Sequence, residues 1–104
     1  MIKDRRAFTE NDENYFEDLS LEEQKVIKQW IYDNFVPRKT LLRGHTSYGL
    51  KHIFSSNTGI YVTNNQFKDA MLKSGYKPVD SNELNWRYCL RKDSPAFDLW
   101  RLRK

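Results

Sequence analysis

Apolar residues recur every three or four positions in three stretches of the chain, which is the pattern of amphipathic helices. Two of these stretches begin with a capping box, in which a hydroxyl residue precedes Glu or Gln by three positions. These pairs are Ser20 with Glu23 and Thr63 with Gln66. The pattern therefore predicts helices at residues 21–35, 47–56 and 64–74.

The pattern changes between residues 84 and 91, where every second residue is apolar, as in a half-buried strand. Residues 76–79 are expected to form the opposing strand, and Pro78 restricts it to a sheet edge. Three helices with a small antiparallel β-hairpin sheet predict an α+β domain of the winged-helix type. We divide the chain into an acidic N-terminal arm, this domain, and an aromatic and basic C-terminal tail, at residues 1–19, 20–92 and 93–104.

Charge is unevenly distributed along the chain. Residues 1–36 carry five basic and nine acidic side chains, whereas residues 37–104 carry thirteen basic and five acidic ones. A basic segment of this density attracts polyanions and exchanges counterions for lysine and arginine contacts, which is the usual electrostatic route to DNA or RNA. The alternative is an ordinary solvated surface. Charge therefore favours DNA as a partner without excluding that alternative.

A winged helix places its last core helix in the major groove, and its hairpin touches flanking phosphates. The predicted helix at residues 64–74 carries asparagines, which can pair with adenine, and lysines, which can reach guanine or phosphate. The alternative is that the asparagines simply occupy the first helical turn. We predict DNA contacts from this helix, from the hairpin and from the basic connector before the second helix, at Arg38, Lys39, Arg43, Asn64, Asn65, Lys68, Lys73, Lys77, Arg87 and Arg91.

Signatures of an enzyme are sparse. His45 and His52 are the two histidines and have no partner at metal-ligand spacing, and the four glycines form no phosphate-binding loop. Cys89 is the single cysteine, so no disulfide framework is possible, and it lacks a catalytic sequence signature. No stretch approaches the roughly 20 apolar residues that cross a bilayer. We therefore expect a non-enzymatic cytoplasmic protein without metal, cofactor or membrane association.

Several runs between residues 35 and 91 resemble small proteins of Gram-positive phages and mobile elements. The runs are Pro37-Arg38-Lys39-Thr40, His45 to His52, Gly59 to Lys68 and Gly75 to Val79. Their layout is also similar to the winged-helix module of phage primase-helicases. The resemblance implies a winged-helix-like fold, a mobile-element origin in a bacterial host cytoplasm, and DNA contact at Asn64, Asn65 and Lys68. The ATPase of the primase-helicases is absent here, so no catalytic activity is implied.

The same resemblance opens a second class of function, because small phage proteins often bind and block a host protein. Several anti-CRISPR inhibitors of the Cas9 nuclease use winged-helix or helix-turn-helix frames, or occupy its nucleic-acid grooves. An acidic arm joined to a basic body suits such a role, with residues 10–23 meeting a basic cleft and with Phe97 and Trp100 anchoring the partner. The alternative prediction is therefore an inhibitor of a host nuclease or replication factor.

Overall fold

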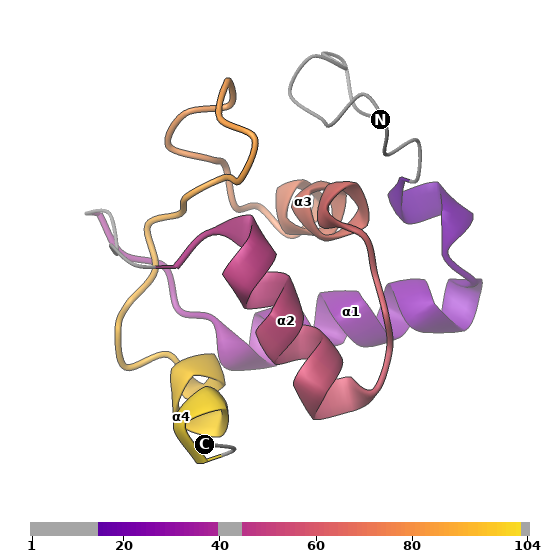
Figure 1. Ribbon diagram of the computed structural model, residues 1–104, viewed down its shortest axis with the longest axis horizontal. Helices are drawn as coiled ribbons and strands as arrows, with labels where there is room; N and C mark the ends of the chain where they lie inside the picture. The colour runs from indigo at the N-terminus through magenta and orange to yellow at the C-terminus, as the bar shows by residue number, and fades with distance from the viewer. Residues whose placement is uncertain (1–14, 40–44, 103–104) are drawn as a thin grey trace.

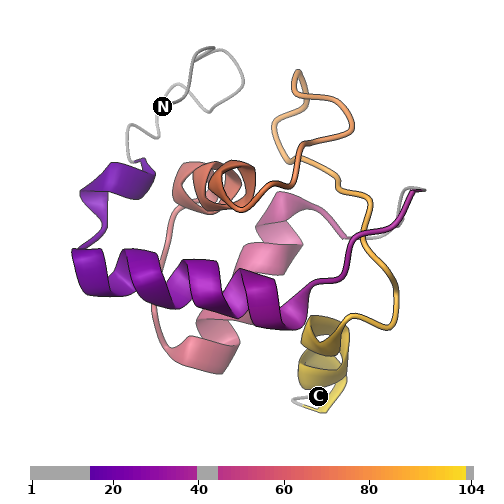
Figure 2. The same ribbon diagram turned by 180° about the vertical axis from the view of Figure 1, so that it is seen from behind.

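The computed structural model describes residues 15–39 and 45–102, and the side chains of residues 15–39 and 45–99. In this part of the chain a short 3-10 helix, η2 (Phe16–Asp18), precedes four α-helices, which are α1 (Leu21–Asn34), α2 (Ser47–Thr58), α3 (Asn64–Lys73) and α4 (Pro95–Leu102). Helix α2 crosses in front of α1, and α3 packs against both (Figure 1). Seen from behind, α1 is the nearest helix (Figure 2). Helix α4 packs on α1 and α2.

The three helices predicted from the sequence are present, each within two residues of its expected bounds. At the start of α1 the Ser20 hydroxyl accepts from the Glu23 amide at 3.1 Å, and the Glu23 carboxylate accepts from the Ser20 amide at 3.2 Å. Thr63 and Gln66 make the same pair of bonds at the start of α3, at 3.2 and 2.9 Å. These bonds satisfy amides that the first helical turn leaves unpaired, so both capping boxes are confirmed.

The predicted β-hairpin sheet is wrong. The described residues contain no β-strand, and the fold is mostly helical rather than an α+β winged-helix type. Residues 86–91 instead pair with the chain before α2 at two isolated bridges, Leu90 with Pro37 and Arg87 with Thr46. The segment assigned to the C-terminal tail, residues 93–104, contains α4, which the sequence did not predict.

The sheet does not form because several backbone amides that would donate its inter-strand hydrogen bonds are absent or bonded elsewhere. Pro37 and Pro78 have no amide hydrogen, so neither can donate to a neighbouring strand. The Trp86 amide donates to the Ser47 hydroxyl at 3.0 Å instead of to a carbonyl. Val79 donates to the Arg87 carbonyl at 2.9 Å, which joins the two arms of the expected hairpin at a single point. Alternating polarity was therefore a correct sign of an extended segment but not of a sheet.

The core is built mainly from aromatic rings. The Trp30 ring meets the rings of Phe54 and Phe35 edge to face, with centroids 5.3 and 5.4 Å apart. Such pairs add to the stabilisation that comes from burying apolar area. The extended segment contributes every second side chain to this core, namely Trp86, Tyr88 and Leu90. Its packing therefore closes the side of the core that the three predicted helices leave open.

Among the described residues, Tyr88 places a hydroxyl group in the core without a hydrogen bond to it. Burial raises the pKa of its phenol, and its hydroxyl has no hydrogen-bond partner in the part of the chain that the structure describes. Because an unsatisfied buried hydroxyl costs about 1–3 kcal/mol, Tyr88→Phe should raise the free energy of unfolding by about 1 kcal/mol. Urea denaturation measures this change. A phenylalanine variant that is less stable than the parent would contradict the expectation.

Candidate nucleic-acid interface

The polar residues of α3 that were predicted to contact DNA lie against the rest of the protein. Asn65 and Lys68 are fully buried, and Asn64 is half-buried. The Asn64 side chain donates to the Asn85 side-chain oxygen at 2.9 Å and accepts from the Ser47 hydroxyl at 2.9 Å. These bonds occupy the amide edge that would otherwise recognise a base. In this arrangement α3 does not present the recognition surface expected from the sequence.

Lys68 shows what covers this face of α3. Its ammonium donates to the Leu84 carbonyl at 2.7 Å and lies 4.6 Å from the centroid of the Trp86 ring. A lysine can be buried when a carbonyl and an aromatic face replace the water around its ammonium. Residues 84–86 therefore cover the side of α3 that sequence reasoning left open to solvent.

The end of the predicted acidic arm docks on the same helix. Asp69 is fully buried and accepts from the Phe16 amide at 3.0 Å. Lys73 forms ion pairs with Asp69 at 3.0 Å and with Glu17 at 3.3 Å. Burial alone would lower the pKa of Lys73, but the hydrogen bonds and charges of Asp69 and Glu17 outweigh it and raise that pKa. Lys73 therefore holds η2 on α3.

The predicted aromatic anchor of the tail is also part of the fold. Phe97 in α4 is 4% exposed, and its ring centroid lies 6.4 Å from that of Phe35 and 4.5 Å from that of His45. Burial lowers the pKa of His45, because the charged imidazolium is poorly solvated there. The Trp100 side chain lies outside the described side chains. A partner would reach Phe97 only by displacing α4.

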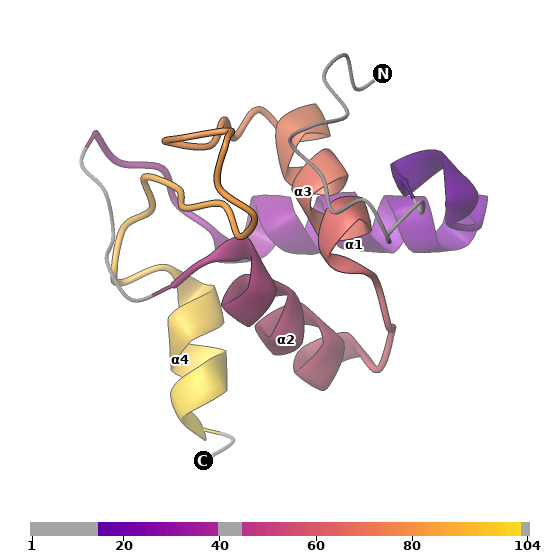
Figure 3. The ribbon, with the colours of Figure 1, turned by 45° about the horizontal axis from the view of Figure 1, so that its top comes forward.

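Most of the other predicted basic residues reach solvent. Lys39, Lys77, Arg87 and Arg91 are exposed, Arg38 is half-buried, and Arg43 lies outside the described residues. All of the described ones except Lys77 belong to two paired segments, residues 36–39 and 86–92, which we call the basic edge. The two segments run along the same side of the molecule (Figure 3). The Arg38 amide donates to the Cys89 carbonyl at 3.0 Å, and the Arg91 amide donates to the Val36 carbonyl at 2.7 Å.

The basic edge carries positive charge on a fixed backbone. Its side chains include five basic residues and no acidic one; the basic residues are Arg38, Lys39, Arg87, Arg91 and Lys92. Because Trp86, Tyr88 and Leu90 point inward, Arg87 and Arg91 lie on the outward side of the segment. Asp93 follows in the chain and pairs with Arg91 at 3.0 Å, which lowers the Asp93 pKa. Exposed pairs of this kind are weak, so a phosphate can compete for the arginine.

Sequence reasoning missed a second group, which we call the aromatic patch and define as Tyr48, Lys51, His52 and Tyr61. Its three rings are exposed, and Lys51 is buried between two of them. The Lys51 ammonium lies 5.2 Å from the ring centroids of both Tyr48 and Tyr61. The His52 ring meets the Tyr48 ring edge to face at 4.5 Å. Spacings of three and four residues on α2 could have joined Tyr48 to Lys51 and His52. Nothing in the local sequence indicates that Tyr61 joins them.

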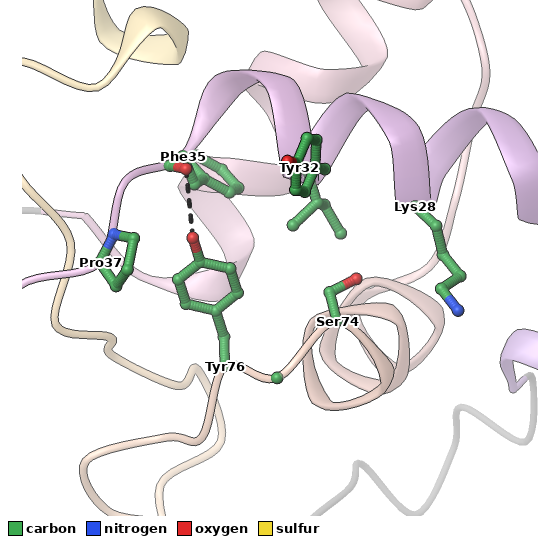
Figure 4. A pocket seen from close by; sticks show the side chains of 8 residues that line it. Lys28, Tyr32, Phe35, Pro37, Ser74 and Tyr76 are labelled. Carbon is green, nitrogen blue, oxygen red and sulfur yellow. Dashed lines mark hydrogen bonds between the residues drawn. The ribbon is translucent and has the colours of Figure 1, made fainter.

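A groove of about 440 Å³ lies between α1 and the chain that leaves α3 (Figure 4). At one end the Tyr76 hydroxyl donates to the Phe35 carbonyl at 3.1 Å, and burial raises the pKa of Tyr76. The lining residues are Lys28, Ile31, Tyr32, Phe35, Pro37, Ser74, Gly75 and Tyr76. This lining has no histidine, cysteine or carboxylate.

Comparisons of the chain with protein-family models, with curated proteins and with solved structures find no match. Among the described residues no group of three or more His, Cys, Asp or Glu side chains is placed to hold a metal ion. No helix in residues 15–39 or 45–102 has both the length and the apolar character needed to span a bilayer.

Proposed function

We propose that the protein is a non-enzymatic nucleic-acid-binding protein that contacts the phosphate backbone through the basic edge. The observation that carries this proposal is that Lys39, Arg87 and Arg91 are exposed on two segments whose backbones are hydrogen-bonded to each other. Lysine and arginine side chains at fixed spacing can replace the counterions condensed on a nucleic acid. The basic edge thus takes the role that sequence reasoning gave to α3.

Backbone contact agrees better with this surface than base recognition does. Phosphate contacts orient a protein on nucleic acid but carry little sequence information, whereas recognition of bases in a duplex needs an element that enters a groove. The helix expected to enter the groove is covered by residues 84–86 and by η2. The proposed binding therefore depends weakly on sequence.

The alternative of a host-protein inhibitor has less support. It relied on Phe97 as an exposed anchor, and Phe97 packs in the core. It also relied on the acidic arm, of which residues 1–14 lie outside the described residues. In the described part of this arm, Glu17 pairs with Lys73 of the same chain.

The proposal predicts a uniform and salt-dependent loss of affinity when the basic edge is neutralised. A variant with both Lys39→Ala and Arg87→Ala should bind duplexes of unrelated sequence more weakly, by a similar factor for each. The slope of log affinity against log salt should fall in magnitude by about 2, since each phosphate contact contributes about 0.9. Fluorescence anisotropy at several salt concentrations measures both effects.

Lys25→Ala is the matched control for this experiment. Lys25 is also an exposed basic residue, and it belongs to the first half of α1. In Figure 1 α1 starts on the side of the molecule opposite to residues 36–39 and 86–92. Its replacement should leave the salt slope nearly unchanged. Binding that is insensitive to salt, or an equal effect of the double variant and of Lys25→Ala, would overturn the proposal.

A further inference from the structure

We infer that the aromatic patch stacks against unpaired nucleobases, so that the protein prefers single-stranded nucleic acid over a duplex. This inference rests on the proposed function, because the basic edge supplies the contacts to phosphate. Proteins that bind single strands with little sequence preference combine a positively charged track for the backbone with aromatic rings for the bases. The basic edge and the aromatic patch supply these two parts.

The two tyrosines are exposed yet held in place. Tyr48 is 52% exposed and Tyr61 is 73% exposed, whereas Lys51 between them is only 6% exposed. Because the Lys51 ammonium lies 5.2 Å from both ring centroids, these centroids are at most twice that distance apart. An ammonium beside an aromatic ring is attracted by the ring's electrons and limits its rotation. Rings fixed in this way lose less conformational freedom when a base stacks on them.

The aromatic patch is connected to the basic edge through the start of α2. Thr46 pairs with Arg87, and the Ser47 amide donates to the Trp86 carbonyl at 2.7 Å. Tyr48 is the next residue, so the patch begins where the basic edge ends. In Figure 1, α2 and the chain that follows it face the viewer, and residues 86–92 run beside the start of α2. A strand whose phosphates follow the basic edge therefore has its bases within reach of α2.

Charge in this region also favours an anionic ligand. The sequence contains no acidic residue between Asp33 and Asp69, a stretch that includes the whole of α2 and the first segment of the basic edge. A polyanion approaching the patch along α2 meets no carboxylate from that stretch. A duplex keeps its base faces stacked inside, so exposed tyrosine rings add little to duplex binding. Unpaired bases offer their faces, and every base has one.

The test compares a fluorescent oligothymidylate with a duplex of equal length, using the full chain and its Tyr48→Ala and Tyr61→Ala variants. Each replacement should weaken binding of the single strand by about 5- to 150-fold, the effect expected for losing one stacked base. Duplex affinity should change by less than about 2-fold, since the basic edge is intact. Tyr61→Phe, which keeps the ring, should bind the single strand as the parent does.

The control is Tyr32→Ala, because Tyr32 is 81% exposed but lies on α1, away from the aromatic patch. It should leave single-strand affinity unchanged, and circular dichroism should show that every variant remains folded. If the Lys39→Ala and Arg87→Ala variant loses affinity for both ligands while the tyrosine variants match the parent, the inference fails and the proposed function stands. If the parent binds neither ligand, the proposed function fails and the inference fails with it.

Discussion

Replacing Phe97 with alanine should lower the free energy of unfolding by about 3–4 kcal/mol. The ring is 4% exposed and packs with Phe35 and His45, so its truncation removes apolar contacts and leaves a cavity beneath α4. Urea denaturation followed by circular dichroism measures the loss. The same variant separates a core role for Phe97 from the partner-anchoring role that its place in the tail suggests.

Tyr32→Ala provides the matched control for Phe97→Ala. It also removes an aromatic ring, but one that is largely exposed, and it should change the free energy of unfolding by no more than about 0.5 kcal/mol. Equal stability losses for the two variants would show that α4 does not close the core. A Phe97→Ala protein that is fully stable yet fails to bind its ligand would restore the anchoring role.

Replacing Asp69 with alanine should cost about 3 kcal/mol of stability, because Asp69 is buried and serves two partners. The Phe16 amide would lose its acceptor, and Lys73 would lose the nearer of its two carboxylates. Both partners would then be only partly solvated in their present positions. We expect η2 to detach from α3 before the rest of the molecule unfolds, which proteolysis after Phe16 detects.

Two further variants test the role of the Asp69 carboxylate. Asp69→Asn keeps one side-chain oxygen for the Phe16 amide but removes the charge that pairs with Lys73. Its free energy of unfolding should therefore lie between those of the parent and of the alanine variant. Asp33→Ala removes an exposed carboxylate that accepts from the Gln29 amide at 2.9 Å, and it should cost less than about 0.5 kcal/mol. An Asp69→Ala protein as stable as Asp33→Ala would contradict a docking role for Asp69.

Helices α1, α2 and α3 could be predicted because their signals are local, whereas α4 was not predicted. Ser20 with Glu23, and Thr63 with Gln66, satisfy amides within one turn, and no distant residue needs to be known. Gly59 ends α2 with a positive φ of 79°, a conformation that glycine adopts readily. The alternation likewise predicted that Trp86, Tyr88 and Leu90 face the core, but it was wrong for Leu84, which is 55% exposed. A sheet, in contrast, depends on backbone donors from distant segments. Pro37 and Pro78 lie in the segments that would pair, and neither has an amide hydrogen to donate.

The residues of the candidate site could be predicted only where the local alternation of polar and apolar residues determines which side chains are exposed to solvent. Arg87 and Arg91 alternate with buried residues, so their exposure could be predicted from the sequence. Lys68 could not be assigned in this way, because lysines are rarely buried and its covering groups come from residues 84–86. Tyr61 was missed for the converse reason, since its link to α2 is a spatial contact with Lys51.

Helix α3 is enclosed along seven consecutive residues, Asn65 to Met71, by η2 and by its neighbours α1 and α2. A helix surrounded in this way cannot separate from α1 or α2 without exposing the centre of the molecule, whereas η2 lies at its edge and can detach alone. Folding free energy is then shared across the whole domain. A ligand that holds the basic edge to α2 would for that reason also protect α1, which it never touches, against thermal melting.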